Sequence, residues 1–282
     1  MPGGRARSAL AGTSGARFAD VRWVAETGST NADAMELARH GAPEGVVVVA
    51  DHQTAGRGRA GRSWTAPPGA SLLVSVLLRP PAGVAEGATM AMALAAAEAV
   101  EEVAGFAPGV KWPNDLVWPG DGSAPDRKLA GILAEADWPT GSSAASGVRR
   151  PAPEERVVVV VGIGINVAWP EDLPEELADV AVACNHVTDV PVDREDLLAA
   201  LLVRLGHWYG RLVDGDRAAL VAAWRERSAT LGRRVRIDLG PDDVVGTAVD
   251  ITERGHLVVD TLEGERRTFA VGDVVHLRPE LA

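Results

Sequence analysis

Two kinds of hydrophobic pattern alternate along the first 231 residues of the chain. Short, continuous apolar runs predict strands buried on both faces, and longer stretches with polar caps and an apolar stripe predict helices. The predicted strands lie at 46–50, 71–78, 110–112, 116–118, 129–136 and 157–168, and the predicted helices at 32–40, at 89–104, after Asp193 and after Asp216. Together they predict one large domain of strands and helices.

The pattern changes after Gly232. Five short alternating stretches, separated by turn residues, predict a small β-barrel over residues 232–282. We assign residues 19–231 to the main domain and predict a disordered tail over residues 1–18, which are rich in Gly, Ala, Arg and Ser. Two segments rich in Pro, Gly, Ser and Asp, 119–127 and 139–155, are predicted to be surface loops.

Composition excludes several classes of protein. The 282 residues are 46% hydrophobic and carry a net charge of -11, which argues against general nucleic-acid binding, since phosphate contacts need a basic surface. No apolar run approaches the length of a membrane span. The single cysteine, Cys184, cannot form an internal disulfide and fits a cytoplasmic location. The six histidines lack zinc-ligand spacing, and no metal ligands are assigned.

Against this acidic background, three arginines alternate with glycines in Gly56–Arg62. Glycine lets the backbone approach a ligand closely, and arginine suits carboxylate and phosphate oxygens, so the segment predicts an anion-binding loop. It matches the dinucleotide fingerprint G-x-G-x-x-G, but that fingerprint must open a helix, and the following segment contains Pro67 and Pro68. A solvated turn with surface charge is the alternative interpretation.

Three further motifs carry polar residues or glycines at strand ends. They read K-W-P-N-D at 111–115, K-L-A-G-I-L at 128–133 and G-I-G-I-N at 162–166. A lysine beside an apolar strand is costly unless it is partnered, and glycine in a strand leaves room for a ligand. These motifs favour a binding site over a simple turn.

In this order the four motifs closely resemble those of biotin protein ligases, over roughly residues 23–279. The S-T-N helix start at 29–31 and the glutamine at 53 match as well. The resemblance implies an α+β fold of the class II aminoacyl-tRNA synthetase type, with a mixed central sheet flanked by helices and a C-terminal SH3-like barrel. It implies the monofunctional type, without an N-terminal DNA-binding domain.

The resemblance also implies roles for particular residues. Those implied to bind biotin are Ser29, Thr30, Asn31, Gln53, Arg57, Gly58, Arg59, Lys128 and Gly131, with Leu133, Gly162 and Gly164 lining the slot. Those implied to bind the nucleotide are Arg57, Arg59, Arg62, Trp64, Asn114, Lys128 and Asn166. Lys128, Arg59 and Asp115 are implied to be catalytic, Asp115 by orienting or deprotonating the acceptor lysine.

Several of these residues also have purely structural interpretations. Trp64 and Trp112 could equally be core aromatics, Asn166 could simply end a strand, and Ser29 could be only a helix cap. Asp115 could be a turn residue.

The implied reaction joins biotin to ATP with Mg²⁺, giving biotinyl-5'-AMP, and then transfers biotin to a lysine of the biotin carboxyl carrier domain of acyl-CoA carboxylases. The carrier domain is the implied partner, and neither nucleic acid nor a membrane is expected to bind. An exposed sheet edge could pair two subunits into a homodimer. The rival functions are a lipoate ligase or lipoyl transferase, a biotin-sensing transcriptional regulator and an anion-binding module without catalysis.

Overall fold

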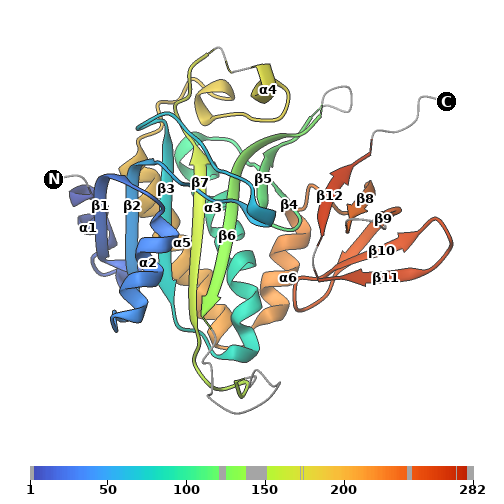
Figure 1. Ribbon diagram of the computed structural model, residues 1–282, viewed down its shortest axis with the longest axis horizontal. Helices are drawn as coiled ribbons and strands as arrows, with labels where there is room; N and C mark the ends of the chain where they lie inside the picture. The colour runs from blue at the N-terminus through green and yellow to red at the C-terminus, as the bar shows by residue number, and fades with distance from the viewer. Residues whose placement is uncertain are drawn as a thin grey trace.

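The computed structural model describes residues 3–120, 125–137, 151–171, 173, 175–239, 243–270 and 272–277. A seven-stranded mixed sheet of order β1-β2-β3-β7-β6-β5-β4 forms its centre (Figure 1). Only β1 and β2 run parallel, and every other neighbouring pair is antiparallel. The strands are β1 (Asp20–Thr27), β2 (Val46–Gln53), β3 (Ser71–Leu78), β4 (Gly109–Lys111), β5 (Asp115–Trp118), β6 (Arg127–Asp137) and β7 (Val158–Asn166).

Helices cover both faces of this sheet, with α2 in front of it and α3 and α5 behind it (Figure 1). Alternate residues of β2 show why its apolar run is continuous. Val47 and Val49 join the core formed with α3 and α5, whereas Val46 and Val48 pack with α2. The α-helices are α1 (Gly4–Leu10), α2 (Thr30–Arg39), α3 (Ala88–Ala104), α4 (Glu175–Ala178), α5 (Arg194–Val213) and α6 (Arg217–Glu226). Short 3-10 turns are η1 (Ser14–Phe18), η2 (Arg59–Gly61), η3 (Ala82–Gly87) and η4 (Cys184–His186).

One helical segment is long and apolar enough to cross a membrane by length and composition. It is Ala82–Ala104, 23 residues with a mean hydropathy of 1.2. Its length became visible only in the structure, because η3 continues directly into α3. Most of α3 is buried against α5 and the sheet, so its apolar composition is that of a core helix.

The N-terminal segment contradicts the predicted disordered tail over residues 1–18. Within it α1 and η1 pack against α5, and Leu10 and Phe18 are completely buried. Arg5 also pairs with Asp193, the N-cap of α5, at 2.8 Å. Its Gly- and Ala-rich composition is typical of disorder, but a few apolar side chains fit the core, and this packing outweighs the compositional signal.

The C-terminal domain is a five-stranded antiparallel sheet of order β11-β10-β9-β8-β12. Its strands are β8 (Arg234–Asp238), β9 (Val244–Ile251), β10 (Leu257–Thr261), β11 (Arg266–Phe269) and β12 (Asp273–His276). Several polar contacts join it to the main domain. The Arg225 guanidinium of α6 pairs with the Asp250 carboxylate at 2.7 Å, and the Trp112 indole donates to the Gly255 carbonyl at 2.8 Å.

The α+β fold with a mixed sheet and a small all-β C-terminal domain confirms the fold prediction. Every predicted strand and helix is present, with ends that differ by at most three residues. The hydrophobic pattern alone did not mark β1, since it alternates with charged residues and its burial is uneven. Residues 121–124 and 138–150, in the two predicted surface loops, lie outside the described residues.

Replacing Phe18 with Ala is expected to lower the free energy of unfolding by about 3 kcal/mol, because the lost aromatic ring leaves a cavity. Leu262→Ala is the matched control, since Leu262 is 63% exposed and its truncation should change stability by less than about 0.5 kcal/mol. Urea unfolding of both variants measures the difference. Equal stability would show that the segment does not pack in solution.

Candidate functional site

A cavity with about 700 Å³ of empty space, part of it open to solvent, lies over β6 and β7 beside the arginine loop. Its lining includes twelve of the fourteen predicted site residues, namely Ser29, Thr30, Asn31, Gln53, Arg57, Gly58, Arg59, Arg62, Trp64, Asn114, Lys128 and Gly131. Leu133, Gly162 and Gly164 line it as expected, and Ser63, Ile132 and Ile163 complete the wall. Segments more than a hundred residues apart in sequence therefore meet at one place.

One wall of the cavity is a connected set of polar groups. The Thr30 backbone N–H and hydroxyl both donate to the Gln53 side-chain carbonyl oxygen, at 2.7 and 2.9 Å. The Ser75 hydroxyl donates to the Asn31 carbonyl oxygen at 2.6 Å, and the Asn31 amide donates to Glu135 at 2.8 Å. The side chains at 30, 31 and 53 are thus oriented before any ligand arrives.

Two members of this wall, Ser75 and Glu135, were missed at the level of sequence. Each was visible as a polar residue inside an apolar strand, Ser75 in β3 and Glu135 in β6, but the strand pattern gave no partner. Ser29 is the N-cap residue of α2, yet its hydroxyl makes no capping hydrogen bond and lines the cavity instead. The interpretation of Ser29 as a cap alone therefore does not fit.

Glycines shape the floor of the cavity. They were expected to leave room for a ligand, but in this structure protein side chains occupy the space beside them. A Cβ atom at Gly164 would lie 2.6 Å from the Trp64 indole, and one at Gly131 would lie 2.9 Å from both Trp64 and Lys128. A Cβ at Gly162 would lie 2.0 Å from the Asn31 carbonyl oxygen. The glycines make room for these protein side chains. The buried Trp64 Nε1 has no hydrogen-bond partner among the described residues.

The arginine loop is a hydrogen-bonded hairpin in this structure. The Gly58 N–H donates to the Arg62 carbonyl at 2.6 Å and the Trp64 N–H to the Gly56 carbonyl at 2.9 Å. At its tip Ala60 and Gly61 both have positive φ, 53° and 73°. A Cβ at Gly56 would lie 2.4 Å from the Trp64 carbonyl oxygen, so this glycine is required for the close approach of the two arms.

The three arginines of the loop point to three different partners. Arg57 pairs with Glu135 at 3.1 Å, on the side of the polar wall. Arg59 donates to the Asn114 side-chain oxygen at 3.3 Å. Arg62 pairs with Asp273 of the C-terminal domain at 3.0 Å. The loop therefore spans the whole cavity, from the polar wall to the C-terminal domain.

Lys128 and Asp115 form an ion pair at 2.7 Å. They come from the neighbouring strands β6 and β5, and the Lys128 ammonium also lies 5.6 Å from the centre of the Trp64 ring. Asp115 does not line the cavity itself and reaches it through Lys128. Burial lowers the pKa of the neighbouring Lys111, against the opposing effect of Asp115.

The remaining predicted residues have structural surroundings. Asn166 is 3% exposed and outside the cavity lining, and its amide donates to the Val182 carbonyl at 3.0 Å. Trp112 is buried and holds the C-terminal domain through its indole, as a core aromatic would. Burial raises the pKa of the Cys184 thiol to about 12, so this cysteine is a poor nucleophile.

The described residues include no group of three or more His, Cys, Asp or Glu side chains that could hold a metal ion.

The chain is similar to known proteins over most of its length. The chain matches the Biotin/lipoate A/B protein ligase family over residues 24–143 and the biotin protein ligase C-terminal domain over residues 230–277. It is 38% identical to the biotin–[acetyl-CoA-carboxylase] ligase of Mycobacterium tuberculosis, covering 94% of this chain and 91% of that protein. It is 32% identical to the bifunctional ligase/repressor BirA of Bacillus subtilis, covering 86% of this chain and 70% of that protein.

A solved structure agrees as well. The biotin protein ligase of Aquifex aeolicus in complex with biotin and ATP superposes with a TM-score of 0.73 at 26% identity, covering 93% of this chain and all of that chain. The ordered motifs, the fold and these relatives together show that the chain belongs to the biotin protein ligase family.

Proposed function

We propose that this protein is a biotin–[acetyl-CoA-carboxylase] ligase, which activates biotin with ATP and transfers it to a lysine of a biotin carboxyl carrier domain. The observation that carries the proposal is that one cavity brings the polar wall together with Lys128 and the arginine loop. A ligand with a polar ring at one end and a carboxylate at the other fits such a site. Two relatives, 38% and 33% identical to this chain, have this activity by name.

The polar wall suits the ureido group of biotin, which offers two N–H donors and one carbonyl acceptor. Asn31 has a carbonyl oxygen with a further lone pair that can accept, and Ser29 has a hydroxyl that can donate. The Thr30 hydroxyl donates to Gln53 and so orients it. Ile132 and Ile163 supply apolar surface for the rest of the ring system. Trp64 forms the facing side, and its unpaired indole N–H is available to a ligand oxygen.

The cationic side of the cavity suits the first chemical step. The biotin carboxylate attacks the α-phosphorus of ATP, an acyl–phosphate bond forms and the bond to the β-phosphate breaks, releasing pyrophosphate. Two anions about 4 Å apart repel by several kcal/mol at the effective dielectric near a protein surface. Arg57, Arg59 and Lys128 would offset this repulsion, and Mg²⁺ would enter with the ATP phosphates.

In the second step the amine of the carrier lysine attacks the acyl carbon, and AMP leaves. The amine must lose a proton, and Asp115 is our candidate to orient it or accept the proton. The ion pair with Lys128 keeps the Asp115 side chain close to Lys128, beside which the biotin carboxylate and the α-phosphate would meet. Rate enhancement then comes from positioning and charge, without a covalent enzyme intermediate.

Several further assignments belong to the same proposal. We propose a cytoplasmic location from the single buried Cys184, and action on the carrier without nucleic acid or membrane partners. A homodimer stays a prediction. Asn166 stays a candidate for contact with the nucleotide only if its surroundings rearrange, since its amide already binds two backbone carbonyls.

Substrate-dependent ATP–pyrophosphate exchange tests the activity. We expect exchange with biotin and at least a hundredfold less exchange with lipoate. Lipoate has no ureido group, so the polar side chains of the wall would be left without hydrogen-bond partners. Exchange with lipoate alone would make the protein a lipoate ligase, and exchange with neither would leave an anion-binding module.

Measuring the two half-reactions separately distinguishes the role of Lys128 from that of Asp115. Lys128→Ala is expected to slow pyrophosphate exchange by on the order of a hundredfold, since a positioned cation is lost. Asp115→Asn should leave exchange within a few-fold and slow transfer from purified biotinyl-5'-AMP to the carrier. Equal losses in both half-reactions of Asp115→Asn would contradict its assignment to the transfer step.

Arg59 is expected to retain the adenylate. Arg59→Ala should raise the rate of biotinyl-5'-AMP release by about tenfold while changing biotin binding less, because only the adenylate presents a phosphate to this side chain. Release is measured by filter retention of radiolabelled adenylate. Arg266→Ala, which removes an exposed arginine of the C-terminal domain, is the matched control.

A further inference from the structure

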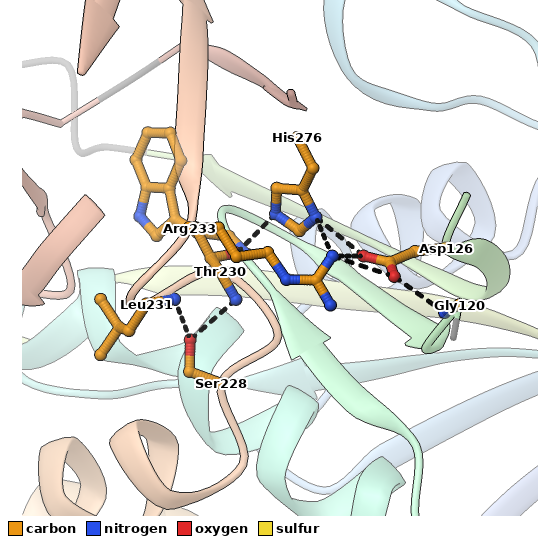
Figure 2. A network of polar contacts seen from close by, with 8 residues as sticks. Gly120, Asp126, Ser228, Thr230, Leu231, Arg233 and His276 are labelled. Atoms are coloured by element: carbon orange, nitrogen blue, oxygen red, sulfur yellow. Dashed lines mark hydrogen bonds and ion pairs between the residues drawn. The ribbon is translucent and has the colours of Figure 1, made fainter. Parts of the chain in front are cut away.

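His276, on β12 of the C-terminal domain, contacts three polar groups (Figure 2). Its Nδ1 lies 2.8 Å from the Asp126 carboxylate, and its Nε2 lies 3.3 Å from the Thr230 hydroxyl. The Arg233 guanidinium is the most distant of the three groups, 3.4 Å from Nδ1. The imidazole is largely buried, with 10% of the side chain exposed, and the Asp126 side chain is 4% exposed. One ring therefore joins an acid in the main domain to the segment that connects the two domains.

The partners of His276 hold the backbone of two segments that reach the cavity. The Thr230 hydroxyl accepts from the Trp112 backbone N–H at 3.0 Å, two residues before Asn114. Asp126 lies two residues before Lys128, where β6 begins. Asn114 and Lys128 both line the cavity. His276 is therefore one contact away from both backbone segments that carry these side chains.

Asp126 is fastened by several donors at once. Its oxygens accept from the Gly120 N–H at 3.0 Å and from the Arg233 guanidinium at 2.9 and 3.1 Å, in addition to His276 (Figure 2). Burial alone would raise the pKa of this carboxyl, but these donors and the positive charge of Arg233 outweigh it and lower the pKa. An ionised Asp126 anchors the start of β6 firmly.

A hydroxyl, an imidazole and a carboxylate in a row also form the catalytic triad of hydrolases. That function does not fit here, because Thr230 is completely buried and no substrate can reach its hydroxyl. The same geometry instead determines which atoms of the network carry the hydrogens. A contact of 2.8 Å to a carboxylate requires a hydrogen on Nδ1, and the Thr230 hydroxyl, which accepts from Trp112, is free to donate to an unprotonated Nε2.

We propose that His276 is a positioning residue for the ligase reaction, whose neutral Nδ1–H form fixes the backbone segments that carry Asn114 and Lys128 into the cavity. The inference rests on the proposed function and gives the C-terminal domain a part in it. Protonation would remove the acceptor for Thr230 and place a third cation beside Arg233 and Lys111, with Asp126 the facing anion.

The charged surroundings keep the ring neutral. Burial, then the positive charge of Lys111, lowers the pKa of His276 to about 4, against the opposing effect of Asp126. Because the unfolded chain binds this proton at about pH 6.5 and the folded chain only near pH 4, the stability contributed is present above pH 6.5 and lost progressively as pH falls toward 4.

The form of the ring is tested by nitrogen NMR on the whole protein with labelled histidine. We expect His276 to show a protonated Nδ1 and an unprotonated Nε2 from pH 5.5 to 8. A His276→Gln spectrum assigns the signal. A ring protonated on Nε2, or doubly protonated at pH 7, would overturn the proposal whether or not the protein is a ligase.

The effect on the reaction is tested with Thr230→Val, which keeps the shape and removes the hydroxyl, and Thr230→Ser, which keeps it. Thr230→Val should lower kcat of biotin-dependent pyrophosphate exchange by on the order of tenfold with the KM for biotin within about twofold, because small displacements of reacting groups are costly. Thr230→Ser should restore most of kcat.

The control is His40→Gln, which removes an exposed histidine of α2 and should leave kcat unchanged. All assays are run at least 15 °C below the melting temperature of each variant. If Thr230→Val lowers the melting temperature but leaves kcat unchanged, the network is structural only and the proposal is wrong. Absence of exchange in the unmodified protein would instead reject the proposed function, while the NMR result would still decide the form of the ring.

Discussion

The site depends on the register between β6 and β7, which places Gly131 directly opposite Gly164. Two facing glycines carry no side chains, so a hollow can form at this point of the sheet. Trp64 and Lys128 enter it from the loop and from the start of β6. A register shift of one residue between these two strands would place an isoleucine, Ile163 or Ile165, opposite Gly131 and fill the hollow.

Charge is the second constraint, because a protein of net charge -11 has to gather cations for anionic substrates. Here these cations have carboxylate partners, Glu135 for Arg57, Asp115 for Lys128 and Asp273 for Arg62, with Arg59 4.0 Å from the same Asp273. Partly exposed ion pairs contribute about 1 kcal/mol or less, so a carboxylate or phosphate of a substrate can replace these partners at small cost.

The C-terminal domain reaches the same place by two routes. Asp273 holds the tip of the arginine loop, and His276, three residues later on β12, contacts the groups that fasten Trp112 and the start of β6. Trp112 adds an indole hydrogen bond to the Gly255 carbonyl. Three contacts on one side of a small sheet thus tie it to both lysine-bearing motifs of the cavity.

The sequence by itself determined most elements and most of the cavity lining, because apolar runs, glycines and charged residues in unusual strand positions carry their meaning locally. Tertiary structure decided the rest. It turned a glycine-rich tail into a packed helix, gave each arginine its own partner and made Asn166 a buried structural amide. It also joined Asp126 to His276, 150 residues apart. Such contacts depend on how separate elements pack, and a local pattern of residues contains no record of which distant group will lie within hydrogen-bonding distance.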